Sequence, residues 1–104
     1  MSLNTRERAA TRDELHANLA LTLLSPATIA AELGISEQRV VAALAVAGSR
    51  PEDIWLVRDY LDYSIRAGGA TPHPYSSLSE DMRAAAQTWF PLVDVQTIID
   101  ERSI

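Results

Sequence analysis

The sequence contains no cysteine, and this absence excludes disulfides, thiolate metal sites and a cysteine nucleophile together. Lysine is also absent, so all nine basic side chains are arginine. Glycine and proline are sparse, with four and five residues, while apolar residues make up 47% of the 104-residue chain. A chain of this length and composition is expected to fold as one packed globular domain over residues 1–104.

Long apolar runs are missing as well. No stretch approaches the roughly 18–20 apolar residues that a membrane-spanning helix needs. The N-terminal sequence MSLNTRERAATRDEL lacks the apolar core of a signal peptide. We therefore expect a cytoplasmic protein that does not enter a membrane.

Positive charge is scarce, and the formal net charge is −5. Residues 1–47 hold four arginines and five acidic residues, a net charge of −1. Residues 48–104 hold five arginines and nine acidic residues, a net charge of −4. The first half is therefore near neutral, and the acidity lies mostly in the second half.

The first predicted helix has a capping box at its start. Thr11 and Glu14 have the spacing at which each side chain accepts a hydrogen bond from the other residue's backbone N–H. Leu15, Leu19 and Leu23 then follow at helical spacing and predict one apolar face. We expect the helix to begin at Thr11, with a short extra turn before it.

Further helix-start and helix-stop residues divide the rest of the chain. Ser25 before Pro26 is a typical helix N-terminus, and Gly34 is a typical end. The same signals predict helices from Ser36 to about Ala47, from Pro51 to Gly68, and from a second capping box, Ser77 with Glu80, to about Trp89. With no confident strand, we predict an all-α fold, a compact domain of five or six helices.

Residues 25–46 have the spacing of a helix-turn-helix, with a small residue, Ala30, where the two helices cross and Gly34 at the tight turn. Apolar side chains supply a shared core at Ile29, Leu33, Ile35, Val40 and Leu44. We therefore predict a helix-turn-helix-like core. Ala-rich helical hairpins with a Gly turn have the same pattern, so the unit need not read DNA.

Contact with DNA would depend on the second helix of this unit, whose early outward positions are Ser36, Glu37, Gln38, Arg39, Val41 and Ala42. Gln38 can read adenine, and Arg39 can read guanine or hold a phosphate. Arg50 and Arg12 are further candidates for phosphate contacts. Because DNA-binding proteins make about 6–10 phosphate contacts, we expect DNA binding only by a dimer.

Aromatic and apolar residues outside this unit are candidates for a dimer interface. Trp55, Tyr60 and Tyr63 lie off the Ile54–Leu61 row of their helix, so that helix is either central to the fold or covered by a partner. The other candidates follow the last strongly predicted helix: Trp89, Phe90, Val95, Ile98 and Ile99. Residues 91–104, which fit a strand or a helix, are a candidate dimerisation segment.

Chemistry-bearing residues give no catalytic pattern. His16 and His73 have no second metal ligand nearby in the sequence, and Asp59 with Asp62 has the spacing of a solvated helix face. No nucleophile motif or phosphate-binding glycine loop accompanies them. We expect no enzyme, no metal and no cofactor.

Several motifs in order resemble one bacterial family. They are "MSLN", "TRDEL", "LTLLSPATIAAELG", "IWLVRDYL" and the "PHPYSSL…R…WF" stretch, over roughly residues 1–92. The chain resembles the small bacterial proteins grouped as domain of unknown function 2316. The resemblance implies a helical, helix-turn-helix-like protein without an established activity, and it brings no site residues.

Two functions follow from these patterns. The first is a homodimeric DNA-binding protein that regulates transcription. The alternative is a protein-interaction module, an adaptor or antitoxin-like partner, which keeps the helical scaffold without binding DNA.

Overall fold

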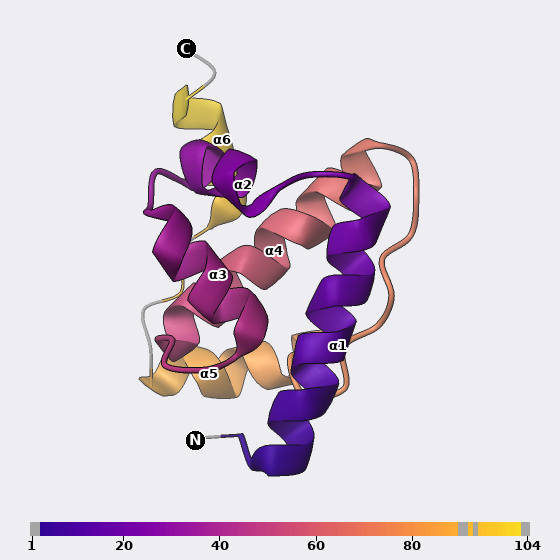
Figure 1. Ribbon diagram of the computed structural model, residues 1–104, viewed down its shortest axis with the longest axis vertical. Helices are drawn as coiled ribbons and strands as arrows, with labels where there is room; N and C mark the ends of the chain where they lie inside the picture. The colour runs from indigo at the N-terminus through magenta and orange to yellow at the C-terminus, as the bar shows by residue number, and fades with distance from the viewer. Residues whose placement is uncertain (1–2, 90–91, 93, 103–104) are drawn as a thin grey trace.

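The computed structural model describes residues 3–89, 92 and 94–102 of the chain. These residues form six α-helices, one 3₁₀ turn and no strand, which confirms the all-α prediction (Figure 1). The elements are α1 (Thr5–Thr22), α2 (Pro26–Leu33), α3 (Glu37–Ala45), α4 (Pro51–Ala67), η1 (Glu80–Met82), α5 (Arg83–Trp89) and α6 (Val95–Arg102).

The N-cap of helix α1 lies seven residues, about two turns, before the predicted one. Asn4 is the N-cap and forms a capping box with Glu7: each side chain accepts a hydrogen bond from the other residue's backbone N–H. Thr11 is fully buried within the helix, so the predicted cap at Thr11 is wrong. The Glu14 carboxylate instead accepts two hydrogen bonds from Ser76, 62 residues away.

The predicted apolar row of α1 is only partly correct. Leu15 is fully buried, and Leu19 packs against the core from a half-buried position. Leu23, however, lies beyond the helix in a left-handed conformation (φ 60°) and is 93% exposed. The fully buried Asn18 takes part in the inward face instead, where it exchanges two hydrogen bonds with the backbone of His73.

Helices α2 and α3 lie where they were predicted, because their boundary signals are local. Ser25 and Ser36 accept hydrogen bonds from the backbone N–H groups of the residues three positions on. Gly34 ends α2 at φ 71°, a conformation that glycine adopts without strain. The two helices pack against each other and bury Ile29, Leu33 and Val40, while the DNA-binding geometry of a helix-turn-helix stays a prediction.

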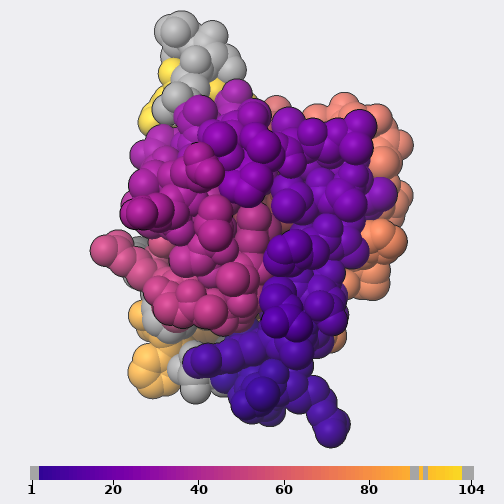
Figure 2. Space-filling view, viewed as in Figure 1, coloured from indigo at the N-terminus to yellow at the C-terminus, as the bar shows by residue number. Residues whose placement is uncertain are grey.

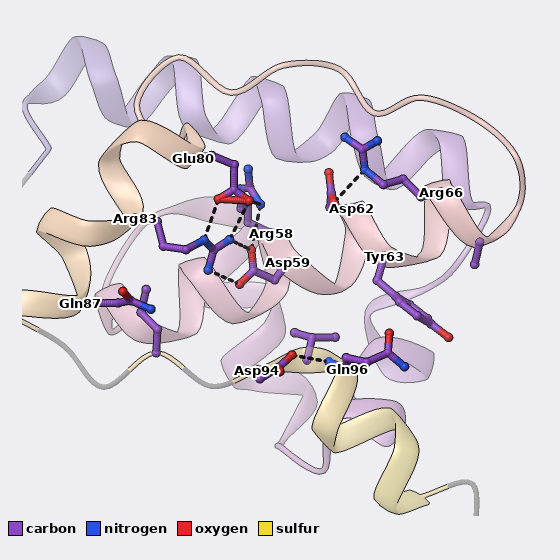
Figure 3. Close-up of a pocket in the computed structure, with 13 residues that line it drawn as sticks. Arg58, Asp59, Asp62, Tyr63, Arg66, Glu80, Arg83, Gln87, Asp94 and Gln96 are labelled. Carbon is purple, nitrogen blue, oxygen red and sulfur yellow. Dashed lines mark hydrogen bonds and ion pairs between the residues drawn. The ribbon is translucent and has the colours of Figure 1, made fainter.

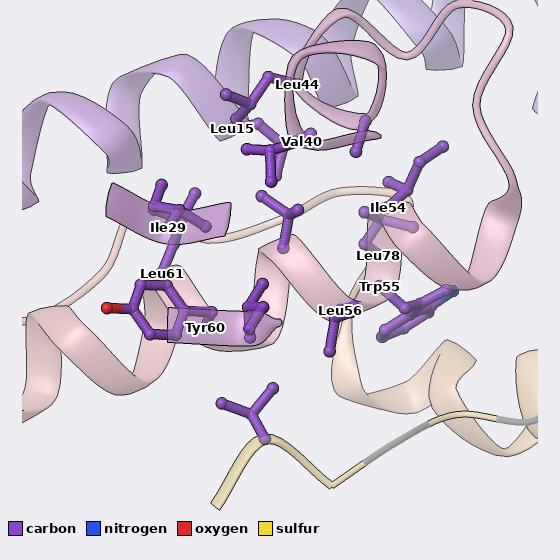
Figure 4. Packing of buried hydrophobic residues seen from close by; sticks show 14 of the residues in the cluster. Leu15, Ile29, Val40, Leu44, Ile54, Trp55, Leu56, Tyr60, Leu61 and Leu78 are labelled. Atoms are coloured by element: carbon purple, nitrogen blue, oxygen red, sulfur yellow. The ribbon is translucent and has the colours of Figure 1, made fainter. Parts of the chain in front are cut away.

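Helix α4 runs through the centre of the molecule and packs against α1, α3 and α6. Nine of its 17 residues are buried, and they point in several directions around the helix. Figure 4 shows Leu61 and Ile54 toward the side chains of α1–α3, with Trp55 and Leu56 on other sides of the helix. Of the two predicted explanations for its all-round apolar surface, burial within this chain is the one observed.

The C-terminal part differs from the sequence-based expectation at one point. The second predicted capping box is wrong: Ser79, without a side-chain hydrogen bond, precedes η1, and α5 starts only at Arg83. The carboxylate of Glu80 accepts hydrogen bonds from Arg83, so it is not turned back toward Ser77. The ambiguous tail is helical over α6, which packs against α2 and α4.

Candidate functional site

The exposed face of α3 is the surface that the sequence analysis assigned to DNA. Figure 2 shows the side of the molecule on which α1, α2 and α3 share one surface. Ser36 is exposed, but its hydroxyl oxygen is engaged as the helix cap by the Arg39 backbone N–H at 3.2 Å. Gln38 is exposed and has no side-chain hydrogen bond within the described part of the chain.

Arg39 does not extend freely from this face. Its Nε and Nη2 atoms donate to the two carboxylate oxygens of Asp53 at 3.0 and 2.6 Å. Asp53 lies in the first turn of α4 and is 3% exposed, whereas the Arg39 side chain is 42% exposed. The hydrogen bonds from Arg39 to Asp53 raise the pKa of the guanidinium, and burial opposes that rise.

This ion pair removes the positive charge of the α2–α3 unit from its outer face. Arg39 is the only basic residue between positions 25 and 46. The exposed side chains beside it are Glu37, Gln38 and the apolar Val41, which is 48% exposed. The face borders a shallow hollow of about 530 Å³ lined by Glu37, Gln38, Val41, Ala42, Ala45 and Ala47.

The other predicted phosphate contacts lie near the first helix and the start of α4. Arg50 is the exposed N-cap residue of α4, and its side chain makes no capping hydrogen bond. Arg12 lies 3.7 Å from Asp13, and both side chains are mostly exposed. The guanidinium groups of Arg6, Arg8 and Arg50 form no ion pair with another described residue.

A second, larger polar site was not foreseen as a unit: a groove of about 700 Å³ between α4, α5 and the start of α6. Figure 3 shows arginine and acidic side chains from α4, η1 and α5 converging on its wall. Arg83 donates to both oxygens of Asp59 at 3.0 and 2.6 Å and to Glu80 at 2.6 Å. On the same helix as Asp59, Arg66 pairs with Asp62 at 3.0 Å.

Arg58 anchors this network in the protein interior, where its side chain is 7% exposed. Its guanidinium carbon lies 5.6 Å from the ring centre of Trp55 and 5.0 Å from that of Tyr75. Its Nε donates to the Leu78 carbonyl at 3.0 Å, and one terminal nitrogen donates to Asp59 at 2.9 Å. Arg58 therefore joins α4 to the loop before α5 through stacking, a hydrogen bond and an ion pair.

The ion pairs of the groove shift the pKa values of Glu80 and Arg83. Hydrogen bonds from Arg83 hold the pKa of Glu80 below its usual value. The pKa of Arg83 is raised, first by its hydrogen bonds to Asp59 and then by those to Glu80. Arg58, Arg66 and Arg83 on this wall each pair with a carboxylate.

The predicted interface residues fall into three environments. Trp55 and Val95 are buried within the chain, at 4% and 5% exposure, and so offer almost no surface to a partner. Ile98 and Ile99 are half-buried against the core, whereas Trp89 is 66% exposed at the end of α5. Phe90 lies outside the described residues. Dimerisation through the exposed members of this set stays a prediction.

The two histidines are structural in their surroundings. His16 Nδ1 lies 2.8 Å from the Arg12 carbonyl oxygen on the same helix, and the His73 backbone is bound by Asn18. Within the described residues, no group of three His, Asp or Glu side chains could hold a metal ion. No described helix is long and apolar enough to cross a membrane.

The roles of Asn18, Arg58 and Asp53 were not predicted from the sequence. Each is a polar residue on an otherwise apolar helix face, and that placement was the available signal. Buried polar side chains of this kind require partners. Those partners, His73, Leu78 and Arg39, lie 14 to 55 residues away in the sequence.

Comparison with protein families gives one match. The family model of the uncharacterised proteins conserved in bacteria, domain of unknown function 2316, matches residues 1–91. The chain belongs to this family. No curated protein and no solved structure matches the chain. The matched segment runs from the N-terminus through α5 and stops before α6.

Proposed function

We propose that this member of the family is a non-enzymatic protein-interaction module of the cytoplasm, whose contact surface is the outer face of α3. The observation that carries the proposal is the Arg39–Asp53 ion pair. It pairs the one basic side chain of residues 25–46 with a buried carboxylate, and the neighbouring outer face carries small apolar side chains together with Glu37 and Gln38.

The composition of this face fits a partner helix better than a phosphate backbone. Val41, Ala42 and Ala45 have side chains short enough for close approach of another helix. A nine-residue helix alone provides less than the roughly 800 Å² per partner of a stable interface. The partner therefore also contacts neighbouring surface of α1 or α2, which lies on the same side of the molecule (Figure 2).

A photo-crosslinking amino acid at position 41 tests this proposal in the bacterium that encodes the chain. We expect it to capture one specific protein repeatedly. The same amino acid at the exposed position Ala20 of α1 is the matched control, and Ala45→Glu should abolish capture from position 41 without changing the circular dichroism spectrum. Equal capture from both positions would refute α3 as the contact surface.

The second candidate is a dimeric DNA-binding regulator of transcription, and the unpaired arginines favour it. Arg6, Arg8 and Arg50 have no carboxylate partner among the described residues, and Gln38 is exposed on α3. In this function, two copies would supply the number of phosphate contacts that one copy lacks. Arg39 would have to exchange Asp53 for a base or phosphate.

Fluorescence anisotropy with random duplex DNA at low salt separates the two functions. A DNA-binding dimer should bind at roughly tens of micromolar, with an affinity that falls steeply as salt is added. Arg50→Ala should then lower the slope of log affinity against log salt by about one. The interaction module predicts no binding at these concentrations.

A further inference from the structure

A small, partly open cavity lies at the N-terminal end of α4, with a volume of about 120 Å³. Its walls are largely apolar and come from the N-terminal segment, the α3–α4 loop, α4, the loop before η1 and α5: Leu3, Val46, Gly48, Pro51, Ile54, Trp55, Leu78 and Ala86. Figure 4 shows three of these side chains, Ile54, Trp55 and Leu78, close together. Apolar cavities of about 150 Å³ stay dry and bind benzene, so this one accommodates an apolar group of that size or slightly smaller.

The rest of the cavity wall is polar and carries one positive charge. Arg8, Ser49 and Ser77 complete the described lining, which includes no acidic residue. Arg8 is exposed and has no carboxylate partner among the described residues, in contrast to Arg58 and Arg83 on the neighbouring wall of the molecule. A guanidinium without a counter-ion, next to two hydroxyls, is a donor set suited to a carboxylate.

The backbone of the same wall is strained. Val46 is buried and has φ 52°, a conformation that a β-branched residue rarely adopts. Its N–H closes α3 by donating to the carbonyls of Ala42 and Ala43, so the strained turn is fixed to the helix. Residues held in such conformations cluster at ligand-binding sites, and this one lines the cavity.

We propose that the cavity binds a small monocarboxylate whose apolar part is no larger than a benzene ring. The apolar part lies against Trp55 and Leu78, and the carboxylate accepts hydrogen bonds from Arg8. Charge complementarity selects the carboxylate over a neutral molecule of the same shape, and the cavity volume excludes larger ring systems. This site is separate from the outer face of α3 and does not depend on the function proposed for that face.

Benzoate is the probe, and the fluorescence of Trp55 reports its binding directly. The chain has two tryptophans, so Trp89→Phe leaves Trp55 as the sole tryptophan, which is excited selectively over the three tyrosines at the red edge of the absorption band. We expect a saturable change in its emission, with a dissociation constant of roughly a millimolar or below for a ligand of so few atoms. A change that grows linearly with benzoate and never saturates would overturn the proposal.

Two substitutions in the full-length chain separate the carboxylate contact from the apolar one. Arg8→Ala should weaken benzoate roughly fivefold to tenfold and leave the neutral benzamide unchanged. Arg12→Ala, one turn further along α1 and outside the cavity wall, is the matched control and should change neither ligand. Ala86→Val should weaken both ligands, because it reduces the cavity volume. Equal benzoate affinity for Arg8→Ala and the unsubstituted chain would refute the role of Arg8.

Discussion

Six arginines of this protein form two contrasting groups. Arg39, Arg58 and Arg83 each donate to a carboxylate, and they join α3, α4 and α5 to one another. Arg6, Arg8 and Arg50, near the start of α1 and α4, have no such partner among the described residues. The first group is therefore part of the folded structure, while the second is free to meet a ligand or a partner.

The contrast between the two groups explains why the net charge of the sequence does not show which arginines are free to bind a ligand or a partner. The acidic second half of the sequence holds the carboxylates that neutralise its own arginines, such as Asp59 between Arg58 and Arg83. Removing an arginine of the first group should lower the stability of the fold. Removing one of the second group should leave stability unchanged, so each group can be tested by substitution.

The largest loss is expected for Arg58→Ala. This substitution removes a buried cation and leaves Asp59 and the Leu78 carbonyl without one donor each, which should lower the free energy of unfolding by about 3–5 kcal/mol. Urea denaturation measures the loss. Arg66→Ala is the control on the same helix: its i, i+4 pair with Asp62 is largely exposed and should contribute only about 0.3–0.5 kcal/mol. Similar losses for both variants would contradict the assigned role of Arg58.

The next largest change in stability is expected from the ionisation of Tyr75, whose ring lies against the Arg58 guanidinium. This change depends on pH. Burial raises its pKa to about 12, compared with about 10 for an unfolded tyrosine. Because the folded state favours the neutral phenol, the contribution of Tyr75 is complete below about pH 10 and is lost as the pH rises toward 12. The loss amounts to about 2–3 kcal/mol.

Ultraviolet absorbance of tyrosinate measures this ionisation. The titration of the unsubstituted chain should contain a late step near pH 12, and Tyr75→Phe should lack it. Tyr63→Phe removes a half-buried tyrosine from the same protein and should keep the late step. A late step of unchanged size in Tyr75→Phe would assign it to another tyrosine, such as the buried Tyr60, whose pKa is also raised by burial.

Helix boundaries were predictable from the sequence where the deciding contacts are local. Ser25, Gly34 and Ser36 act on backbone groups within a few residues, and all three bound helices as predicted. The two predicted capping boxes failed for one shared reason: their glutamates accept hydrogen bonds from other residues, Glu14 from one 62 positions away and Glu80 from one three positions on. Glu14 accepts from Ser76, and Glu80 accepts from Arg83 within the α4–α5 network. No pattern at the caps themselves distinguishes these cases.

The exposed face of α3 could likewise be predicted only as far as its local contacts determine it. The sequence analysis placed Arg39 correctly on the exposed second helix of the α2–α3 unit, but its pairing depends on how α3 crosses the first turn of α4. That crossing is a tertiary property. The cavity beside Trp55 was equally out of reach, because its walls come from five separate parts of the chain.

Arg39→Ala should have an intermediate effect, since its partner keeps other support. Asp53 remains in the first turn of α4, where the helix dipole favours a negative charge. We therefore expect a loss of about 1–2 kcal/mol in unfolding free energy. A double-mutant cycle with Asp53→Asn measures the pair: the double variant should lose less than the sum of the single variants. Additive losses would mean that the ion pair contributes nothing.

The smallest effects are expected for the unpaired arginines. Arg50→Ala and Arg8→Ala remove exposed cations that contact no carboxylate among the described residues, so each should change the unfolding free energy by no more than about 0.5 kcal/mol. Urea denaturation beside Arg39→Ala provides the comparison. A loss as large as that of Arg39→Ala would place the arginine in the structural group. If the urea midpoint of the variant is unchanged, the arginine does not stabilise the fold and its charge is available for binding. Any loss of ligand or DNA affinity in the same variant then reflects binding and not folding.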